Sequence, residues 1–356
     1  MPRISFARFR LVSVVALTFA ASASPAQTTF AVGNCRPTLP NFQTISAALA
    51  AAPPGAVVEV CPGTYNEQIV ITQPVTLEGV TISDSAQAII AVPSGGLVPN
   101  GDFVPQLWVN NASGSVNISD LTVDASGNGI TNSFHVVGIF YENSSGTVNH
   151  VTTQNQSGNG NGVGIVALGG SSNLSVTIEN SSIHDYDHSG IEVENIQASE
   201  LTAVIKGNAV TTRMPMSQLG ILIDGSTITA QVTSNLIVLP GADGIVGTSF
   251  ARGSISGNTV VNAGGIGIVD QSDGVAVTSN KIFGSPTGIQ LLTSVAAIQS
   301  NSITKSTTGV DFQCGADPNV RSNIIMDTGT ALNSVPSAIA PRDAYFNVGT
   351  IRAGGC

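Results

Sequence analysis

Short stretches in which apolar and polar residues alternate run through most of the chain. The segment Val75-Thr76-Leu77 and the stretch from Val277 to Ile282 are examples. Such alternation is typical of a β-strand with one buried face. Gly, Asn, Ser, Asp or Pro interrupts the pattern every few positions, too often for helices of ten or more residues. The pattern therefore predicts an all-β protein built from many short strands.

Two markers recur along the chain and keep the same phase. A glycine followed by Ile or Val returns every 21 to 30 residues, at Gly138, Gly164, Gly190, Gly220, Gly244, Gly267, Gly288 and Gly309. An Asn-x-Val/Ile marker follows the same rhythm at Asn208, Asn235, Asn258, Asn280, Asn301 and Asn323. A repeat of this length cannot bury its apolar face alone, but stacked copies can. We therefore expect a single-domain solenoid whose successive coils pair as parallel strands.

The repeated asparagines predict a ladder inside this solenoid. An Asn at a tight corner tolerates the left-handed conformation. At the same corner of every coil, its amide can hydrogen-bond to the amide above. Leu121 and Ser181 occupy the corresponding place in earlier coils, so we expect the ladder only in the later ones.

The first 80 residues differ from the repeat. Residues 1–26 have the charged, apolar and small-residue order of a secretory signal peptide, so we expect a secreted protein without membrane insertion. Within an N-terminal cap and first coil at 27–80, Phe42, Ile45 and Leu49 recur at helical spacing before Pro53, which predicts a short capping helix. Coils are expected over 81–330, and a closing tail over 331–356.

The four cysteines fit export to an oxidising compartment. One pair flanks the first segment of the mature chain and the other brackets the last, and no Cys-x-x-Cys or Cys/His spacing indicates a metal site. We expect two disulfides, a pairing inferred from position alone: Cys35 with Cys61, and Cys314 with Cys356.

The opening of the mature chain carries a family resemblance. The segments 42–48 (FQTISAA), 62–67 (PGTYNE) and 76–79 (TLEG) resemble the start of secreted right-handed parallel β-helix proteins. The Gly-Ile and Asn-x-Ile coils that follow resemble the repeat of the pectate-lyase-like superfamily. The resemblance implies a right-handed parallel β-helix over about residues 35 to 330. That superfamily includes polysaccharide lyases, hydrolases, esterases, epimerases and adhesins, so the resemblance leaves the activity open.

Charge narrows the range of partners. The chain has 12 Lys and Arg against 22 Asp and Glu, a formal charge of −10, which argues against nucleic acid and anionic lipid surfaces. The scarcity of cations also argues against a pectate-type lyase, which needs basic groups to hold a polyanion. We expect a monomer that contacts an extracellular polysaccharide through one lateral face.

The densest group of reactive residue types lies between Ile183 and Glu194. Counting from each repeated glycine, positions +2 and +4 should face outward, because the Ile at +1 faces inward. Glu142, Glu194 and Asp224 all fall at +4, with Leu168 between the first two. We therefore expect an acidic band with two histidines at its margin. Its candidate catalytic residues are Asp185, Tyr186, Asp187, His188, Glu192, Glu194 and Asp224.

Several interpretations of this band stay open. Two carboxylates could act as general acid and base on a glycosidic bond. Tyr186 and His188 could move a proton at a uronate carbon, as in uronan lyases and epimerases. The oxygens could bind Ca²⁺. The band could also be a solvated face of a non-enzymatic structural or surface-interaction solenoid. Trp108, the single tryptophan, could stack on a sugar or cover a flank.

Overall fold

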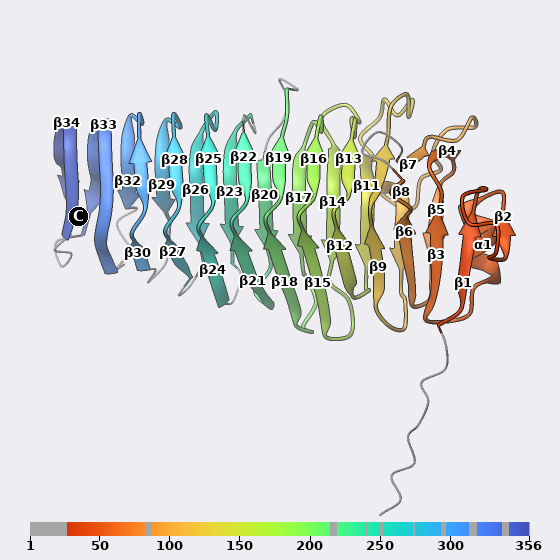
Figure 1. The fold of residues 1–356 in the computed structure, drawn as a ribbon. Helices are drawn as coiled ribbons and strands as arrows, with labels where there is room; N and C mark the ends of the chain where they lie inside the picture. Colours follow the sequence, from red (N-terminus) through yellow and green to blue (C-terminus); the bar gives the residue numbers. More distant parts are fainter. Residues whose placement is uncertain are drawn as a thin grey trace, which may run out of the picture.

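The structure, a computed structural model, describes residues 27–82, 87–213, 219–238, 241–249, 252–272, 275–292, 297–312, 319–336 and 342–355. One continuous parallel sheet winds into a spiral of stacked coils (Figure 1). Through most of the molecule a coil has three short strands, and each strand pairs with the strand three places later, as β11 (His135–Glu142) does with β14 (Gly162–Leu168). We call the three sides of the spiral faces A, B and C, in chain order.

Each face is a column of parallel strands. Face A contains β1 (Thr29–Val32), β3 (Ala56–Val60), β6 (Val75–Gly79), β9 (Val116–Ser119), β12 (Gly146–Asn149), β15 (Leu174–Glu179), β18 (Leu201–Lys206), β21 (Ile228–Thr233), β24 (Arg252–Ser256), β27 (Ala276–Thr278) and β30 (Ala297–Gln299). Face B contains β4 (Gly63–Asn66), β7 (Ala88–Ala91), β10 (Leu121–Asp124), β13 (Thr152–Gln154), β16 (Ser182–His184), β19 (Ala209–Thr211), β22 (Leu236–Val238), β25 (Thr259–Val261), β28 (Lys281–Phe283) and β31 (Ser302–Thr304). Face C contains β5 (Ile69–Ile71), β8 (Phe103–Asn110), β11, β14, β17 (Ser189–Glu194), β20 (Leu219–Asp224), β23 (Asp243–Thr248), β26 (Ile266–Gln271), β29 (Thr287–Leu291) and β32 (Thr308–Phe312).

The last two strands are long and turn the corners without a break. β33 (Asn319–Val335) pairs in parallel with β30, β31 and β32 in succession. β34 (Arg342–Gly355) pairs in parallel with β33, for example Thr330 with Thr350. The segment after residue 330, for which the sequence predicts a closing tail, therefore continues the spiral instead, because its backbone still finds a parallel partner along its length.

Aliphatic side chains fill the interior in vertical columns. The residue after each marker glycine lies directly above its counterpart in the next coil, as Ile191, Ile221 and Ile245 do. All three are fully buried. Burying such a side chain contributes roughly 1.5–3 kcal/mol. The predicted inward position of the residue after each glycine is confirmed.

The marker glycines themselves form a close backbone stack. A Cβ placed on Gly220, Gly244 or Gly267 would lie 2.4–2.6 Å from the carbonyl oxygen of the next marker glycine. On the other side it would meet an apolar side chain of face B, such as Val260 beside Gly244. None of these glycines has a positive φ, so their lack of a side chain, and not their conformational freedom, fits them to this place.

The asparagine ladder is confirmed and lies at the corner between faces A and B. Each of its rungs, Asn208 to Asn301, donates from its backbone N–H and its side-chain amide to the Oδ1 of the next Asn, at 2.9–3.0 Å. Ser181 starts the series by donating its N–H to Asn208, and Asn323 ends it by donating to Asp343. The ladder asparagines are buried, so these bonds replace water for the corner's backbone groups.

The left-handed residue at this corner differs from the sequence prediction. It is the residue before each ladder Asn that has positive φ, namely Gly207, Ser234, Gly257, Ser279, Ser300 and Ser322. The bend at that residue turns the following Asn inward, where its amide reaches the next coil. The asparagines are therefore placed at the corner by hydrogen bonding and not by a tolerance of the left-handed conformation.

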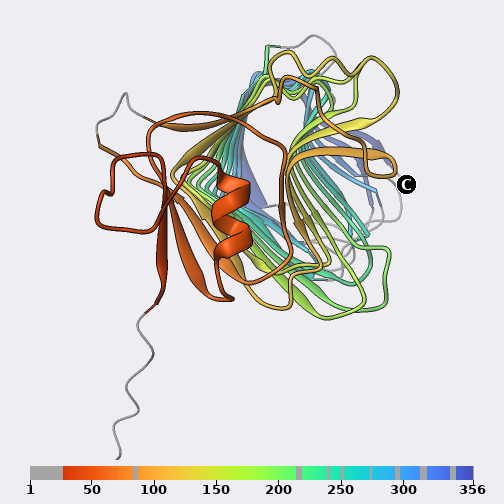
Figure 2. The same cartoon turned by 90° about the vertical axis from the view of Figure 1, so that its right-hand side faces the viewer.

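A seven-residue helix, α1 (Ile45–Ala51), lies across the first coils (Figure 2). Its Ile45, Ala48 and Leu49 are buried. Thr44 caps the helix by accepting from the N–H of Ala47, and the carboxylate of Glu67 accepts from the N–H groups of Ile45 and Ser46. An anion at this end is favoured by the helix dipole. The strand β2 (Asn41–Phe42) pairs with β1 beside it.

The predicted disulfide between Cys35 and Cys61 is present. It joins the segment after β1 to the residue that follows β3, across a sequence separation of 26. Cys314, Cys356 and the predicted signal peptide at 1–26 lie outside the described residues. In the part of the chain that the structure describes, no helix is long and apolar enough to cross a membrane.

Candidate functional site

Face C presents two outward columns of side chains that carry its chemistry. One column runs through Trp108, Phe140, Val166 and Glu192, which are aligned by the parallel register of β8, β11, β14 and β17. The second runs through Glu142, Leu168, Glu194 and Asp224, as the sequence predicts. Glu192 and Glu194 therefore lie on one strand, and Asp224 lies beside Glu194 on the next coil.

Glu192 lies almost fully under the surface although its strand position faces outward. Its side chain is 4% exposed, and burial raises its pKa. Its Oε1 is 3.4 Å from Nε2 of His188, and a hydrogen bond with the Ser189 side chain opposes part of the pKa rise. Glu192 therefore favours the neutral carboxyl more than an exposed glutamate does.

Glu194 also has a raised pKa. Burial, with the neighbouring carboxylates Glu192 and Asp224, raises it to about 7. Asp224 is exposed and accepts a hydrogen bond from the hydroxyl of Thr248 at 2.7 Å. A carboxyl group with a pKa near neutrality, as at Glu194, can hold and release a proton at neutral pH.

Two imidazoles border the carboxyl groups. The rings of His135 and His188 meet edge to face with centroids 5.9 Å apart. Burial lowers the pKa of both, and each therefore favours the neutral imidazole. Nδ1 of His135 is buried and has no hydrogen-bond partner among the described residues. The candidate residues predicted from the sequence do not include His135, which lies in an earlier coil, 53 residues before His188.

Aromatic residues form the wall next to the histidines. The ring of Phe103 lies 5.4 Å from that of His135 and 4.8 Å from that of Phe140. Trp108 is partly exposed and donates its indole N–H to Oε2 of Glu142 at 3.0 Å. We call the set Phe103, Trp108, His135, Phe140, Glu142, His188, Glu192, Glu194 and Asp224 the face C site.

A groove of about 300 Å³ opens beside this site, where the face C strands end. Glu142 and Leu168 line one part of it, and Gly169, Gly170 and Ile196 line another. A Cβ on Gly170 would lie 1.8 Å from Oδ1 of Asn143, so a larger residue does not fit the close approach at this point. The groove therefore begins at Glu142 and Leu168 in the outward column and extends over the residues that follow the face C strands.

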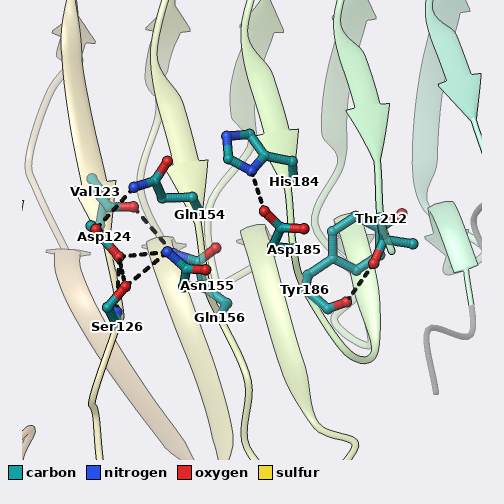
Figure 3. Close-up of polar contacts among 10 residues, drawn as sticks. All are labelled: Val123, Asp124, Ser126, Gln154, Asn155, Gln156, His184, Asp185, Tyr186 and Thr212. Atoms are coloured by element: carbon teal, nitrogen blue, oxygen red, sulfur yellow. Dashed lines mark hydrogen bonds and ion pairs between the residues drawn. The ribbon is translucent and has the colours of Figure 1, made fainter. Parts of the chain in front are cut away.

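The polar run from His184 to His188 does not form one cluster. His184 lies on face B, where its Nδ1 is 2.8 Å from Oδ2 of Asp185, beside Gln154 of the preceding coil (Figure 3). Asp185 has a positive φ and turns the corner towards face C. Only His188 reaches the margin of the acidic band, so the expectation of two histidines from this run is wrong in this respect.

Tyr186 and Asp187 point into the protein and not onto the outer face. Tyr186 is fully buried in the main core, and its carbonyl accepts from the hydroxyl of Thr212 (Figure 3). Asp187 accepts hydrogen bonds from the backbone N–H groups of Gly158, Gly160 and Gly162. The carboxylate of Asp187 thus holds the loop before β14 in place beneath the site.

Metal ligation receives no support from the arrangement of donors. In the described residues no three His, Cys, Asp or Glu side chains are grouped closely enough to hold a metal ion. The carboxyl groups of the predicted calcium site are divided between the buried Asp187, face B and face C.

Comparisons with known proteins identify the fold. A family model described as "Right handed beta helix region" matches residues 203–338, and one described as "Protein of unknown function (DUF1565)" matches residues 37–268. No curated protein matches the chain.

Solved structures with a similar fold include an alginate lyase from Paenibacillus sp. str. FPU-7, with a TM-score of 0.54 at 12% identity over 90% of this chain and 98% of that one. The Dettilon tailspike protein has a TM-score of 0.53 at 12% identity, over 85% of this chain and 64% of that one. A mannuronic acid specific polysaccharide family 6 lyase from human gut microbiota has a TM-score of 0.51 at 13% identity, over 85% and 72%. At these identities the likeness concerns the fold alone.

Proposed function

Because this chain belongs to the family described as "Protein of unknown function (DUF1565)" and has a pectate-lyase-like β-helix fold, we propose its function from the chemistry of the face C site. We propose that it is a secreted protein that binds a neutral extracellular polysaccharide along face C. Two of the similar folds belong to an alginate lyase and a mannuronic acid specific polysaccharide lyase, which supports a polysaccharide as the ligand class.

The observation that carries this proposal is the combination of aromatic rings and carboxyl groups on one strip without a cation. Trp108 offers an apolar ring face, and the neighbouring carboxyl groups can accept hydrogen bonds from sugar hydroxyls. The six strands from β8 to β23 on face C contain no Lys or Arg. A polyuronate would meet only negative charge on this strip, whereas a neutral chain would not be repelled.

Removing the ring of Trp108 is expected to weaken this binding. Trp108→Ala should lower the affinity for a neutral oligosaccharide about tenfold, because the stacking surface is lost. Titration calorimetry with gluco-, manno-, xylo- and galacto-oligosaccharides would measure the change. Phe283→Ala, which removes an exposed aromatic ring on face B, is the matched control and should bind as the original protein does. Equal affinities for the Trp108→Ala variant and the original protein would contradict binding on face C.

Hydrolysis is a second candidate function, favoured by the raised pKa of Glu194 beside Asp224. In this scheme the protonated Glu194 gives its proton to the glycosidic oxygen as the bond to the anomeric carbon breaks. The Asp224 carboxylate attacks that carbon and forms a covalent glycosyl ester, because register partners on neighbouring strands lie about 4.8 Å apart, close to the spacing of retaining glycosidases. A water molecule then hydrolyses the ester: the Glu194 carboxylate takes the water's proton, and the Asp224 carboxylate leaves. Because Tyr186 is buried in the core, we do not propose proton transfer from a uronate by Tyr186 and His188.

Glu194→Gln tests this scheme directly. The amide cannot donate the catalytic proton, so the release of new reducing ends from a neutral polysaccharide should fall at least about 100-fold while binding persists. Reducing-end assays and calorimetry on the same samples would separate the two effects. Thr248→Val, which replaces the hydroxyl that contacts Asp224 with a methyl group, should retain most of the rate. Binding without any products from the original protein would exclude hydrolysis and leave a binding module.

The same substitution predicts a pH-dependent gain in stability. The folded pKa of Glu194, about 7, lies above its ordinary value of 4.5, so ionisation disfavours the folded state. The stabilising effect of the neutral form is complete below about pH 4.5 and is lost as the pH rises through about 7. The melting temperature of Glu194→Gln should therefore rise relative to the original protein over this interval.

Leu236→Gln, at an exposed apolar position on face B away from Glu194, provides the control for that pH series. It introduces an amide without removing an ionisable group, so its difference from the original protein should be the same at every pH. A pH-independent difference for Glu194→Gln as well would show that the carboxyl of Glu194 is not perturbed.

A further inference from the structure

A second groove, of about 450 Å³, lies on face B, on a different side of the spiral from the face C site. Its volume is in the range of small-molecule sites in proteins. The polar side chains that line it include Asp120, Thr122, His150, Thr152, Asn180 and Ser182. No part of the function proposed above uses these residues, so the inference drawn from them does not depend on that function.

The bed of this groove is a row of hydroxyl groups in register. Thr122, Thr152 and Ser182 occupy the same outward position of β10, β13 and β16. Parallel strands of successive coils lie about 4.8 Å apart, so the groove offers one hydroxyl at each such step. The hydroxyls of Thr152 and Ser182 have no partner within the described residues, whereas Thr122 donates to Gln87 at the edge of the groove. These two hydroxyls are therefore available to a ligand.

The groove is bounded along the chain. Thr81 and Gln87 line it at its N-terminal end. At the other end of the groove, Ala209 follows Ser182 in the same column, and its small side chain leaves the groove open there. The column then changes to Leu236, which is 43% exposed and apolar. The row of hydroxyl groups thus covers the coils of β10, β13 and β16, and the groove ends at Ala209 of β19, so a short linear segment fits this length better than a long one.

The side wall adds polar groups and a negative charge. Nδ1 of His150 is 2.6 Å from Oδ1 of Asp120, and the side chain of His150 is 72% exposed. No Lys or Arg lines the groove, and no aromatic ring apart from the imidazole of His150 does. An anionic ligand would be repelled by Asp120, and a lipid would find little apolar surface, whereas a neutral polyhydroxylated ligand matches the hydroxyl, amide and imidazole groups.

We propose that the face B groove binds a neutral oligosaccharide segment that runs along the axis of the spiral, with successive sugars over successive coils. The step between coils is close to the rise per sugar of an extended glycan, so each sugar meets the same kind of hydroxyl donor and acceptor. The face B groove is a separate site from face C, and one protein molecule therefore has two binding sites for neutral glycans.

The test uses the full chain and weakens the face C contribution first. Neutral tetrasaccharides of the gluco, manno, xylo and galacto series are titrated calorimetrically at millimolar concentrations into the Trp108→Ala variant and into the same variant carrying Ser182→Phe. The difference between the two titrations reports on face B, because the weakened face C site is the same in both. Adding Thr152→Val and Ser182→Ala to Trp108→Ala should weaken the face B binding about tenfold, because two hydrogen bonds are lost. A tetrasaccharide oxidised to carry uronate groups should bind more weakly than its neutral parent.

A blocking variant and its matched control make the result specific. Ser182→Phe fills the face B groove and should leave only the weakened face C binding, with melting temperatures used to check that the variant is folded. Ser302→Phe places the same ring at the same column position, beyond Leu236 and outside the groove, and should leave the binding unchanged.

The two proposals fail in distinguishable ways. If the Trp108→Ala variant binds none of the tetrasaccharides while the original protein does, the face B site is refuted and binding on face C stands. If Trp108→Ala has no effect and Ser182→Phe removes all binding, the face B site stands and face C is refuted. If Ser182→Phe and Ser302→Phe bind equally well, or no tetrasaccharide binds the original protein, the face B proposal is wrong.

Discussion

Asn258→Ala is expected to lower the free energy of unfolding by about 4 kcal/mol, because it leaves several buried polar groups without partners. The Asn258 side chain accepts from the backbone N–H and the amide of Asn235. Its Nδ2 donates to the backbone carbonyl of Val232 and to Oδ1 of Asn280. Asn258 is fully buried, so water does not replace these bonds.

Urea denaturation followed by circular dichroism would measure this loss. The matched control is Asn173→Ala, which removes one exposed hydrogen bond to the N–H of Glu200 and should cost at most about 1 kcal/mol. Similar losses for both variants would mean that the ladder contributes no more than an ordinary surface turn.

Gly244→Ala is the second substitution with a large expected effect. The new Cβ would lie 2.4 Å from the carbonyl oxygen of Gly267 and 2.6 Å from Cγ1 of Val260. The oxygen belongs to the backbone of the next coil, so it cannot move without disturbing the strand pairing. Overpacking of this kind typically costs about 1–3 kcal/mol, and we expect the upper end of that range.

Gly95→Ala separates this clash from the general effect of replacing a glycine. No atom lies within 4 Å of a Cβ placed on Gly95, and its φ is not positive. That variant should be as stable as the original protein or more stable by about 0.5 kcal/mol, because the unfolded chain loses freedom. A melting temperature for Gly244→Ala equal to that of Gly95→Ala would contradict the close backbone stack.

The architecture was predictable because each coil places the same residue types at the same positions. A glycine is required wherever backbone meets backbone, as at Gly244, and the residue after it must be aliphatic to fill the interior. The Asn marker follows from the buried corner, because its amide accepts through Oδ1 from one neighbouring coil and donates two hydrogens from Nδ2, one of them to the next Asn. The outward column of Glu142, Glu194 and Asp224 followed from the alternation of side chains along a strand.

The candidate site was less predictable because its residues come from corners and loops. The run from His184 to His188 has one polar composition, yet the bend at Asp185 sends successive side chains to face B, the core and face C. His135 meets His188 only after a loop of variable length, which no fixed period reveals. The last coil was missed because Asp343 replaces the marker Asn, although its distance of 20 residues from Asn323 could have indicated it.

The replacement of Asn by Asp at position 343 has a consequence for the length of the molecule. Every ladder Asn up to Asn323 accepts hydrogen bonds from the preceding coil and donates hydrogen bonds to the following coil. A duplicated coil inserted between Asn208 and Asn323 would therefore find a donor on one side and an acceptor on the other. A carboxylate at 343 receives but has no amide to give, and a turn inserted after it would lack that tie. Whole coils can therefore be duplicated or deleted between Asn208 and Asn323 without breaking the ladder, whereas the ladder ends at Asp343.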